Sequence, residues 1–374
     1  MKKSKVLIIG GGFAGCASAH LLGMKGDFDV TLIELSPVLG AGVRTYFMGG
    51  HPYTFGPRHF LTQKQWIFDY LNQYLPLRRC NEHQFVTYVE KDANFYSYPI
   101  HEDDISRMPD SKEILSQLSN TNIESIKNSK NLEEYWINSV GKNLYNKFIN
   151  DYSKKMWNVS DNTKIDDFGW SPKGATLKKG PRAAWDIAIS AYPIALDGYN
   201  AYFDIATAKA KVLLNTKIER FDIDKKIVVF NGNEEKYDII INTISPDILF
   251  DFCFGELPYM GRDLIKLILP VEFALPKDVY FSYYAGEENF TRVVEYKKLS
   301  GYKSDSTLIG IEFPSNNGRH YPMPFLSEYD RAEKYFNLMP ENVYSIGRAG
   351  SYRYQVDIDD CIEQAFEVIN KILK

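Results

Sequence analysis

The first 34 residues alternate between short apolar runs and a glycine-rich segment in an order that predicts a strand, a helix and a second strand. Residues 6–9 are an apolar run that ends in three glycines, and residues 17–22 are compatible with a helix. A second apolar run follows at residues 30–33 and ends at Glu34. Short apolar runs bounded by glycine turns are typical of the buried strands of a parallel sheet.

Beyond residue 63 the pattern predicts several further elements. We expect a helix and connector at 63–85, two short strands within 85–98, polar helices over 102–160, strands within 212–242, an antiparallel sheet over 265–313 and a strand at 343–346. The last helix begins at Asp357, where Asp357 and Asp360 resemble a capping arrangement. Residues 158–184 are rich in Gly, Pro, Ser and Lys without a period, so we predict a long mobile loop there.

The glycine-rich segment also predicts a ligand. Gly10, Gly12 and Gly15 fit the dinucleotide fingerprint, in which a tight turn lets a pyrophosphate approach the start of a helix. Phe13 and Ala14 begin that helix, and Glu34 closes the next strand, where a carboxylate can accept hydrogen bonds from a ribose. A strand ending in Gly347 and Arg348, followed by the capped helix at Asp357 and Ile358, favours FAD over NAD. The positive end of that helix can stabilise an anionic reduced flavin.

Length and pattern together predict an α/β protein with a Rossmann-type FAD-binding domain, an inserted helical domain and an antiparallel β-sheet domain. A chain of 374 residues is long enough for two or three domains. We assign residues 1–77, 200–243 and 338–374 to the FAD-binding domain. Residues 102–199 form the helical domain with the mobile loop 158–184, and residues 78–101 and 244–337 form the sheet domain.

Composition narrows the classes of partner. A net charge of −4 gives no reason to expect a nucleic acid or an anionic membrane as partner. No apolar segment approaches the length of a membrane span, and the N-terminal run is broken by glycines, so we do not interpret it as a signal peptide. The four cysteines show neither metal-ligand nor redox spacing, and we predict free thiols, no metal site and a cytoplasmic location.

Motifs along the chain then resemble a known family. Residues 131–157 are similar to the segment of UDP-galactopyranose mutases that ends in a Gly-Tyr-Thr-Glu-Lys-Gln-Trp type motif, and Phe148, Tyr152 and Trp157 keep its spacing. Further matches follow the family order: Gly56-Pro57-Arg58-His59-Phe60 with Thr62, Phe254-Gly255-Glu256-Leu257-Pro258-Tyr259, the run from Phe290 to Lys297, Tyr321-Pro322, Gly347-Arg348 and Tyr352-Arg353-Tyr354. The resemblance covers nearly the whole chain.

The resemblance implies a flavin-dependent isomerase that interconverts the pyranose and furanose forms of a nucleotide sugar for surface polysaccharide biosynthesis. In that family N5 of reduced FAD attacks the anomeric carbon and displaces the nucleoside diphosphate. A homo-oligomer, either a dimer or a tetramer, is expected. A fixed guanidinium can hold the leaving phosphates in a bidentate fork.

The residues that we expect to serve each role follow from the motifs and the resemblance. The expected catalytic residues are Arg58, Arg182, Arg292, Tyr321 and Tyr354. The expected cofactor-binding residues are Gly10, Gly12, Phe13, Ala14, Gly15, Glu34, Gly42, Arg58, His59, Arg348, Asp357 and Ile358. The expected substrate-binding residues are His101, Phe148, Tyr152, Trp157, Arg182, Tyr192, Arg292, Tyr321 and Tyr354.

Departures from the family pattern leave the sugar and the base open. Arg58 stands where the family has a flavin-side His, and His101 and Ser282 stand where it has Asn. UDP-galactopyranose is the default substrate, with an N-acetylated hexosamine, a 6-deoxyhexose on dTDP or a heptose as variants. An FAD-dependent oxidoreductase of the amine oxidase type is the alternative function, because it shares the same architecture, and a non-catalytic flavoprotein is a third hypothesis.

Overall fold

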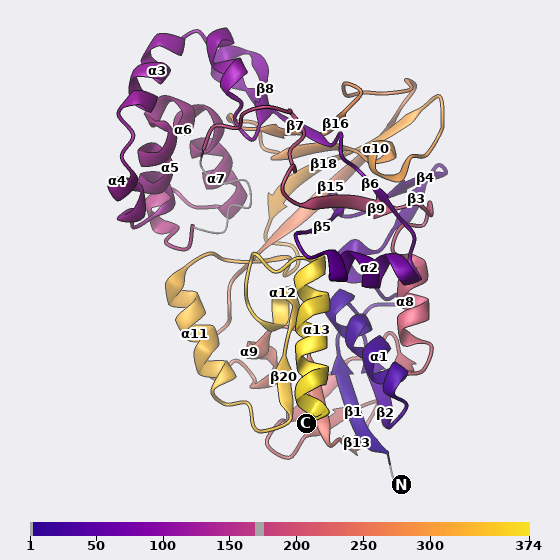
Figure 1. Cartoon of the computed structure of the whole chain (residues 1–374). Helices are drawn as coiled ribbons and strands as arrows, with labels where there is room; N and C mark the ends of the chain where they lie inside the picture. Colours follow the sequence, from indigo (N-terminus) through magenta and orange to yellow (C-terminus); the bar gives the residue numbers. More distant parts are fainter. Residues whose placement is uncertain (1–2, 169–175) are drawn as a thin grey trace.

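A computed structural model describes residues 3–168 and 176–374 of the chain. Three regions are visible in Figure 1: a parallel sheet with helices beside it, a larger twisted sheet above it, and a cluster of helices to one side. Residues 169–175 of the predicted loop lie outside the described residues. Within the described residues, no helix combines the length and the apolar character needed to span a membrane.

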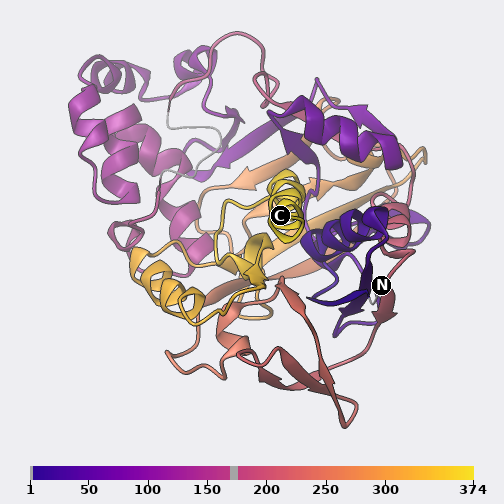
Figure 2. The same ribbon diagram turned by 60° about the horizontal axis from the view of Figure 1, so that its bottom comes forward.

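The parallel sheet gathers strands from three distant parts of the chain in the order β10-β2-β1-β14-β20, and every pair in it is parallel. Its strands are β1 (Ser4–Ile9), β2 (Phe28–Ile33), β10 (Lys211–Leu213), β14 (Ile239–Asn242) and β20 (Val343–Ser345). The helices α1 (Phe13–Lys25), α8 (Asn200–Thr207) and α13 (Ile358–Ile372) pack together beside it. Figure 2 looks along α13 from its C-terminal end, with α1 on one side and the helical cluster on the other. The predicted strand–helix–strand start is confirmed.

The larger sheet has seven strands in the order β19-β15-β18-β17-β16-β7-β8. They are β7 (Gln84–Val89), β8 (Asn94–Tyr98), β15 (Tyr259–Leu269), β16 (Val279–Tyr284), β17 (Arg292–Glu295), β18 (Thr307–Ser315) and β19 (Tyr321–Pro322). Our prediction of a purely antiparallel sheet is wrong at one place, because β7 and β16 pair in parallel. Parallel neighbours need a long connection rather than a hairpin, and here more than 180 residues, which include the helical cluster and strands β10 and β14 of the parallel sheet, separate the two strands.

The helical cluster follows β8 and has its own core. Its helices are α3 (Ser111–Ser119), α4 (Ile123–Lys127), α5 (Leu132–Val140), α6 (Lys142–Phe148) and α7 (Asn150–Trp157), preceded by a 3-10 turn at Glu102–Arg107. Asn131 caps α5 by accepting a hydrogen bond from the backbone N–H of Glu134. Buried side chains of α5–α7, including Trp136, Phe148 and Trp157, pack in one cluster with Met260 and Tyr321 of the larger sheet. The helical cluster is therefore packed against the larger sheet.

Smaller elements connect these regions. They are β3 (Tyr46–Met48), β4 (His51–Tyr53), β5 (Phe60–Thr62), α2 (Gln65–Tyr74), β6 (Leu77–Arg79), β9 (Ile189–Pro193), β11 (Ile218–Asp222), β12 (Ile227–Phe230), β13 (Asn233–Lys236), α9 (Pro246–Leu249), α10 (Tyr296–Ser300), α11 (Leu326–Phe336) and α12 (Gly347–Gly350). Strand β9 pairs with both β5 and β6, although its residues fall in the range that we assigned to the helical region. The pairing ties the segment after the predicted loop back to the parallel-sheet side of the molecule.

Candidate functional site

The turn between β1 and α1 has the geometry that a pyrophosphate-binding loop needs. Gly10 has a φ of +99°, and its N–H donates to the carbonyl of Ile33 at 2.9 Å. A side chain at Gly15 would overlap the carbonyl oxygen of Gly10, so only glycine allows α1 to lie this close to β1. Helix α1 begins after Gly12 without a side-chain cap. Its first N–H groups and the positive end of its dipole are thus available to an anion.

A cleft of about 290 Å³ opens over this turn. Nine predicted cofactor residues line it together: Gly12, Phe13, Ala14, Gly42, Arg58, His59, Arg348, Asp357 and Ile358. Gly10 and Gly15 shape the turn beneath it. Glu34 accepts hydrogen bonds from the backbone N–H groups of Gly11 at 2.6 Å and Ser36 at 2.7 Å, so its carboxylate is fixed at the end of β2.

The opposite wall of this cleft is the start of α13. Asp357 and Asp360 form the predicted capping box, in which each side chain accepts the other residue's backbone N–H. Arg348 donates from Nε to the carbonyl of Val356 at 2.8 Å and forms an ion pair with Asp357. The guanidinium of Arg348 is therefore held at the boundary between this cleft and a second pocket.

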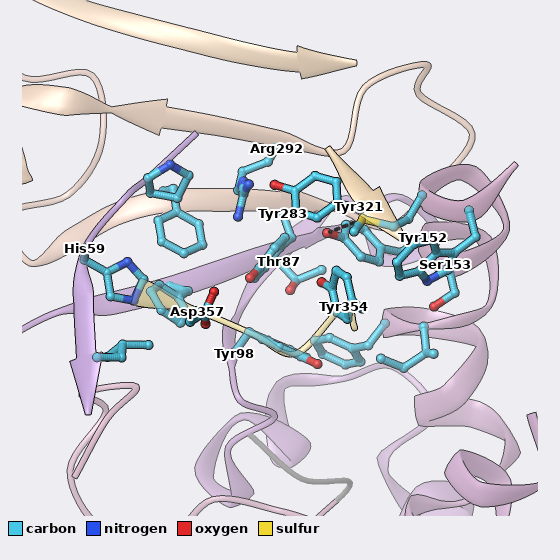
Figure 3. A pocket seen from close by; sticks show the side chains of 18 of the residues that line it. His59, Thr87, Tyr98, Tyr152, Ser153, Tyr283, Arg292, Tyr321, Tyr354 and Asp357 are labelled. Carbon is cyan, nitrogen blue, oxygen red and sulfur yellow. Dashed lines mark hydrogen bonds between the residues drawn. The ribbon is translucent and has the colours of Figure 1, made fainter. Parts of the chain in front are cut away.

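The second pocket, of about 230 Å³, lies between the larger sheet and the helical cluster. It shares Pro57, Arg58, His59, Leu61, Arg348 and Asp357 with the first cleft, so the two cavities adjoin at these residues. Figure 3 shows His59 and Asp357 at one end, Arg292 with Tyr283 in the middle, and Tyr152 with Ser153 at the end formed by the helices. Six of the expected substrate-binding residues line this pocket: Phe148, Tyr152, Trp157, Arg292, Tyr321 and Tyr354. Arg58, which we expect to serve catalysis and cofactor binding, lines it as well.

Arginine side chains gather in the middle of this pocket. Arg292 donates from Nε to Glu312 Oε1 at 3.0 Å and from Nη2 to Glu312 Oε2 at 2.7 Å. Arg58 Nη2 donates to the hydroxyl of Tyr321 at 3.4 Å, and the guanidinium of Arg262 lies 4.8 Å from the centre of the Tyr321 ring. Within residues 3–168 and 176–374, neither Arg58 nor Arg262 has a carboxylate in ion-pair range. The site therefore carries positive charge that an anionic ligand would neutralise.

This positive charge changes the pKa of the Tyr321 hydroxyl. Burial raises the pKa of Tyr321, but the nearby guanidinium groups of Arg58, Arg262 and Arg292 outweigh it and lower that pKa to about 8. The phenol is a neutral donor below that pH and a phenolate above it. Burial together with Arg58 and Arg262 also lowers the pKa of His320, on the rim of the first cleft, to about 4.

The end of the second pocket beside the helices is aromatic. Trp157 of α7 packs edge-on against Tyr354, with ring centroids 4.9 Å apart, and Tyr152 packs edge-on against Tyr283 at 5.3 Å. Phe148 lies 6.5 Å from Tyr98 in a stacked arrangement. Flat aromatic surfaces of this kind suit a heterocyclic base, since base–aromatic stacking contributes about 1–3 kcal/mol per base.

Three of the predicted substrate-binding residues lie outside both cavities. Arg182 pairs with Asp104 at 3.0 Å and with Ser97, on the outer side of β8. Tyr192 is buried in β9, where its ring contacts Tyr199 at 5.8 Å. One imidazole nitrogen of His101 lies 2.9 Å from the carbonyl oxygen of Gly180. The structure does not bring these side chains to the pocket, because each is held by the contacts just described.

Sequence reasoning missed several lining residues on the sheet. Phe85 and Thr87 of β7 and Phe281 and Tyr283 of β16 line the second pocket, and the parallel register places Phe281 beside Phe85 and Tyr283 beside Thr87. Alternation within each strand puts such i, i+2 residues on one face. The sequence showed the alternation within each strand, but it did not show which strand pairs with which. Arg262 of β15, which lies against the Tyr321 ring without lining this pocket, was also missed.

Comparison with known proteins identifies the family. The family model described as UDP-galactopyranose mutase matches residues 147–354, more than half of the chain. The chain belongs to the UDP-galactopyranose mutase family. A model described as an NAD(P)-binding Rossmann-like domain matches residues 8–74, which include the turn between β1 and α1.

Individual relatives of the UDP-galactopyranose mutase family match over the full length. A dTDP-fucopyranose mutase of Escherichia coli is 26% identical over 403 residues, which cover 99% of each chain. A probable UDP-galactopyranose mutase of Klebsiella pneumoniae is 23% identical, with 100% of this chain and 96% of the relative covered. The crystal structure of a reduced UDP-galactopyranose mutase superposes with a TM-score of 0.82 at 18% identity, covering 100% and 94% of the two chains. The predicted resemblance, the fold class and the assignment as an isomerase are confirmed.

Proposed function

We propose that the protein is a flavin-dependent isomerase that interconverts the pyranose and furanose forms of a nucleotide-activated sugar. The observation that carries this proposal is that the two cavities adjoin: the cleft over the glycine-rich turn shares Arg58 and Arg348 with an aromatic pocket that also contains Arg292. The relatives named as mutases of UDP-galactopyranose and dTDP-fucopyranose support the same reaction class. The amine oxidase alternative is less well supported, because the matching family is one of mutases.

The residues of the first cleft fit FAD. The uncapped start of α1 and the three glycines of the turn suit a pyrophosphate, and Glu34 is fixed where a ribose would lie. Arg58, His59, Arg348 and the start of α13 lie at the boundary of the two cavities, where an isoalloxazine ring would face the second pocket. When bound in its reduced form, this group would supply a nucleophilic nitrogen for the anomeric carbon.

The protein's own residues would bind, orient and neutralise the substrate. Phe148, Tyr152 and Trp157 would stack on the base. Arg292 and Arg58, with the hydroxyl groups of Tyr321 and Tyr354, would hold the diphosphate as it leaves the sugar and returns to it. Fixed donors placed where charge develops are effective catalytic groups, because they need no reorganisation during the reaction. We further propose that the reaction serves surface polysaccharide biosynthesis. We also propose a cytoplasmic location, which the four free cysteines support.

We expect the purified protein to contain flavin and to isomerise a nucleotide sugar only after reduction with dithionite. A panel of UDP, dTDP and GDP sugars would be offered, and the products separated by anion exchange. A new peak of identical mass that depends on reduction would support the proposal. Bound FAD with no isomerisation of any sugar would contradict it and would favour the oxidoreductase alternative, which oxygen-dependent turnover of amines would then test.

We expect the affinity for UDP and dTDP to fall as the pH rises above 8. Diphosphate binding favours the protonated phenol of Tyr321, because a phenolate would place a second negative charge among the same arginines. The dissociation constant should change little until about one unit below pH 8, then curve upwards and approach a rise of about tenfold per pH unit above pH 8. Titration calorimetry across this range would measure the slope.

The pH dependence has a matched control within the pocket. Tyr321→Phe should abolish the slope above pH 8, whereas Tyr354→Phe should keep it, since burial raises the pKa of Tyr354 well above that range. An unchanged slope in Tyr321→Phe would show that another group titrates.

A further inference from the structure

The start of α13 offers no free positive charge to the first cleft, although the sequence predicted that this helix stabilises an anionic reduced flavin. Arg348 forms an ion pair with Asp357, and the first turn of the helix also carries Asp359 and Asp360. Carboxylates at a helix N-terminus offset the positive end of its dipole. Burial first, and then the charges of Asp360 and Asp357, raise the pKa of Asp359 to about 7. A new negative charge at this wall would therefore meet carboxylates that already repel one another.

Arg292, a second cation of the pocket, is compensated as well. Its guanidinium donates to both carboxylate oxygens of Glu312, at 3.0 Å and 2.7 Å. Glu312 lines a small cavity together with Arg58, Arg262 and His320, but both of its oxygens accept from Arg292. The charge of Arg292 is thus balanced before any ligand binds.

The guanidinium of Arg58 is fixed by neutral groups instead. Its Nε donates to the carbonyl oxygens of Phe55 at 2.7 Å and Gly42 at 3.1 Å, and its Nη2 donates to the hydroxyl of Tyr321 at 3.4 Å. These partners hold the group in place without cancelling its unit charge, and among the described residues it has no carboxylate in ion-pair range. Of the three arginines that line the second pocket in the described part of the chain, Arg58 is the uncompensated one.

This charge acts on both sides of the boundary between the cavities, because Arg58 lines the first cleft and the second pocket. After burial, Arg58 is the strongest influence on His320 at the rim of the first cleft, whose pKa is lowered to about 4. It is also the strongest of the charges that lower the pKa of Tyr321 in the second pocket to about 8. Figure 3 shows His59, the next residue in the chain, at the same end of the second pocket as Asp357. An isoalloxazine ring at this boundary would lie in the field of Arg58.

We propose that Arg58, rather than Arg348 or the start of α13, is the cation that stabilises the bound flavin in its anionic reduced form. Reduction takes up two electrons, here from dithionite, and one proton, so the ring gains one negative charge. Arginine stays protonated throughout, and its position is fixed before the charge forms. This inference rests on the proposed function and adds to it the residue that favours the reduced cofactor.

The midpoint potential of the bound flavin tests the proposal without any turnover. For a two-electron couple, a tenfold loss of affinity for the reduced relative to the oxidised form lowers the potential by about 30 mV. Arg58→Gln keeps a donor for the backbone carbonyls but removes the charge. We expect it to lose about 10- to 100-fold of this relative affinity, or about 30–60 mV, because an opposite charge nearby shifts an ionisation by at least that much. Arg58→Lys keeps the charge and should stay close to the unmodified protein.

Several outcomes would overturn the role of Arg58. They are an unchanged potential in Arg58→Gln, an equal fall in Arg58→Gln and Arg58→Lys, and an absorbance spectrum of the fully reduced, unmodified protein that shows the neutral form of the ring. Where a variant loses its flavin on purification, titration with oxidised and with reduced FAD gives the same ratio of affinities. Arg220→Gln, in an exposed pair with Glu234, is the matched control and should leave the potential unchanged.

Asp357→Asn tests the compensation at α13. Asn is as good an N-cap as Asp, so the helix start should persist while Arg348 loses its counter-charge. We expect the potential to rise, and an unchanged potential would overturn the choice of Arg58 over Arg348. These readouts do not depend on isomerisation. If no sugar is isomerised, the proposed function fails while the potentials still decide the role of Arg58, whereas a protein that binds no FAD would overturn both.

Discussion

Replacing Arg292 with Ala is expected to lower kcat by about 10²- to 10³-fold while the protein still binds FAD, because a fixed donor for the leaving diphosphate is lost. Arg292 is 18% exposed and lies in the middle of the second pocket, away from the glycine-rich turn that would hold the cofactor. Steady-state turnover with the substrate found in the panel and the flavin absorbance of the variant would measure both effects. Normal turnover would exclude the proposed role.

The same change has a second consequence, which must be separated from the first. Glu312 is only 3% exposed and accepts two hydrogen bonds from Arg292. Removing one partner of such a buried pair leaves an uncompensated charge, which costs about 3–5 kcal/mol in the free energy of unfolding. Arg292→Ala therefore loses activity and stability together, and the remaining carboxylate would repel a diphosphate.

A paired substitution resolves the two effects. Arg292→Met combined with Glu312→Gln removes both charges, and we expect it to recover most of the lost stability in urea unfolding without recovering kcat. Arg220→Ala is the matched control for an arginine–carboxylate pair, because Arg220 and Glu234 are both more than half exposed. It should change stability by less than about 1 kcal/mol and leave turnover unchanged. Recovery of kcat in the double variant would show that the single change acted only through Glu312.

The elements that sequence analysis predicted well are those with local signals. The apolar runs of β1 and β2, the glycine turn between them and the capping pair Asp357 and Asp360 each depend on residues close together in the chain. The parallel pairing of β7 with β16 has no such signal, because the two strands are far apart in sequence and either orientation fits their alternating pattern. Topology that depends on distant partners could only come from the structure.

The same distinction explains the candidate site. Residues inside compact motifs, such as Trp157, Arg292 and Tyr321, line the predicted pocket. Arg182 and Tyr192 fall outside these compact motifs, and the structure holds them at other contacts. Their predicted roles remain predictions, because neither side chain lies at the pocket in the structure. Phe85 and Phe281 depend on sheet register and could not be found from one strand alone.

The three departures from the family pattern lie in different places in the structure. Arg58 lies at the boundary of both cavities and adds charge beside Tyr321. Ser282 alternates with Phe281 and Tyr283, so its buried side chain points to the other face of β16. His101 contacts the backbone of the loop. Of these three changes, only the one at Arg58 faces the pocket.

Replacing Gly15 with Val is expected to abolish flavin binding. The new Cβ would overlap the carbonyl oxygen of Gly10 and lie 3.3 Å from Cγ2 of Ile8, and a backbone atom cannot rotate away as a flexible side chain can. Helix α1 would have to move off β1, which displaces the helix start from the cleft and costs about 3 kcal/mol in the free energy of unfolding through overpacking. The ratio of flavin to protein absorbance and urea unfolding would measure the two losses.

A glycine at the other end of the same helix shows whether the effect is specific to the turn. At Gly23 an added Cβ would meet no backbone atom, and its nearest neighbour is Cβ of Lys209 at 3.1 Å, so Lys209 has to move by only a few tenths of an ångström. Gly23→Ala should therefore retain flavin and gain up to about 1 kcal/mol, because Ala is the better helix former. Suppose instead that Gly15→Val keeps its flavin while Gly23→Ala behaves as expected. That result would show that the close approach of α1 to β1 does not position the pyrophosphate. The assignment of the first cleft to a dinucleotide would then rest on Glu34 and α13 alone.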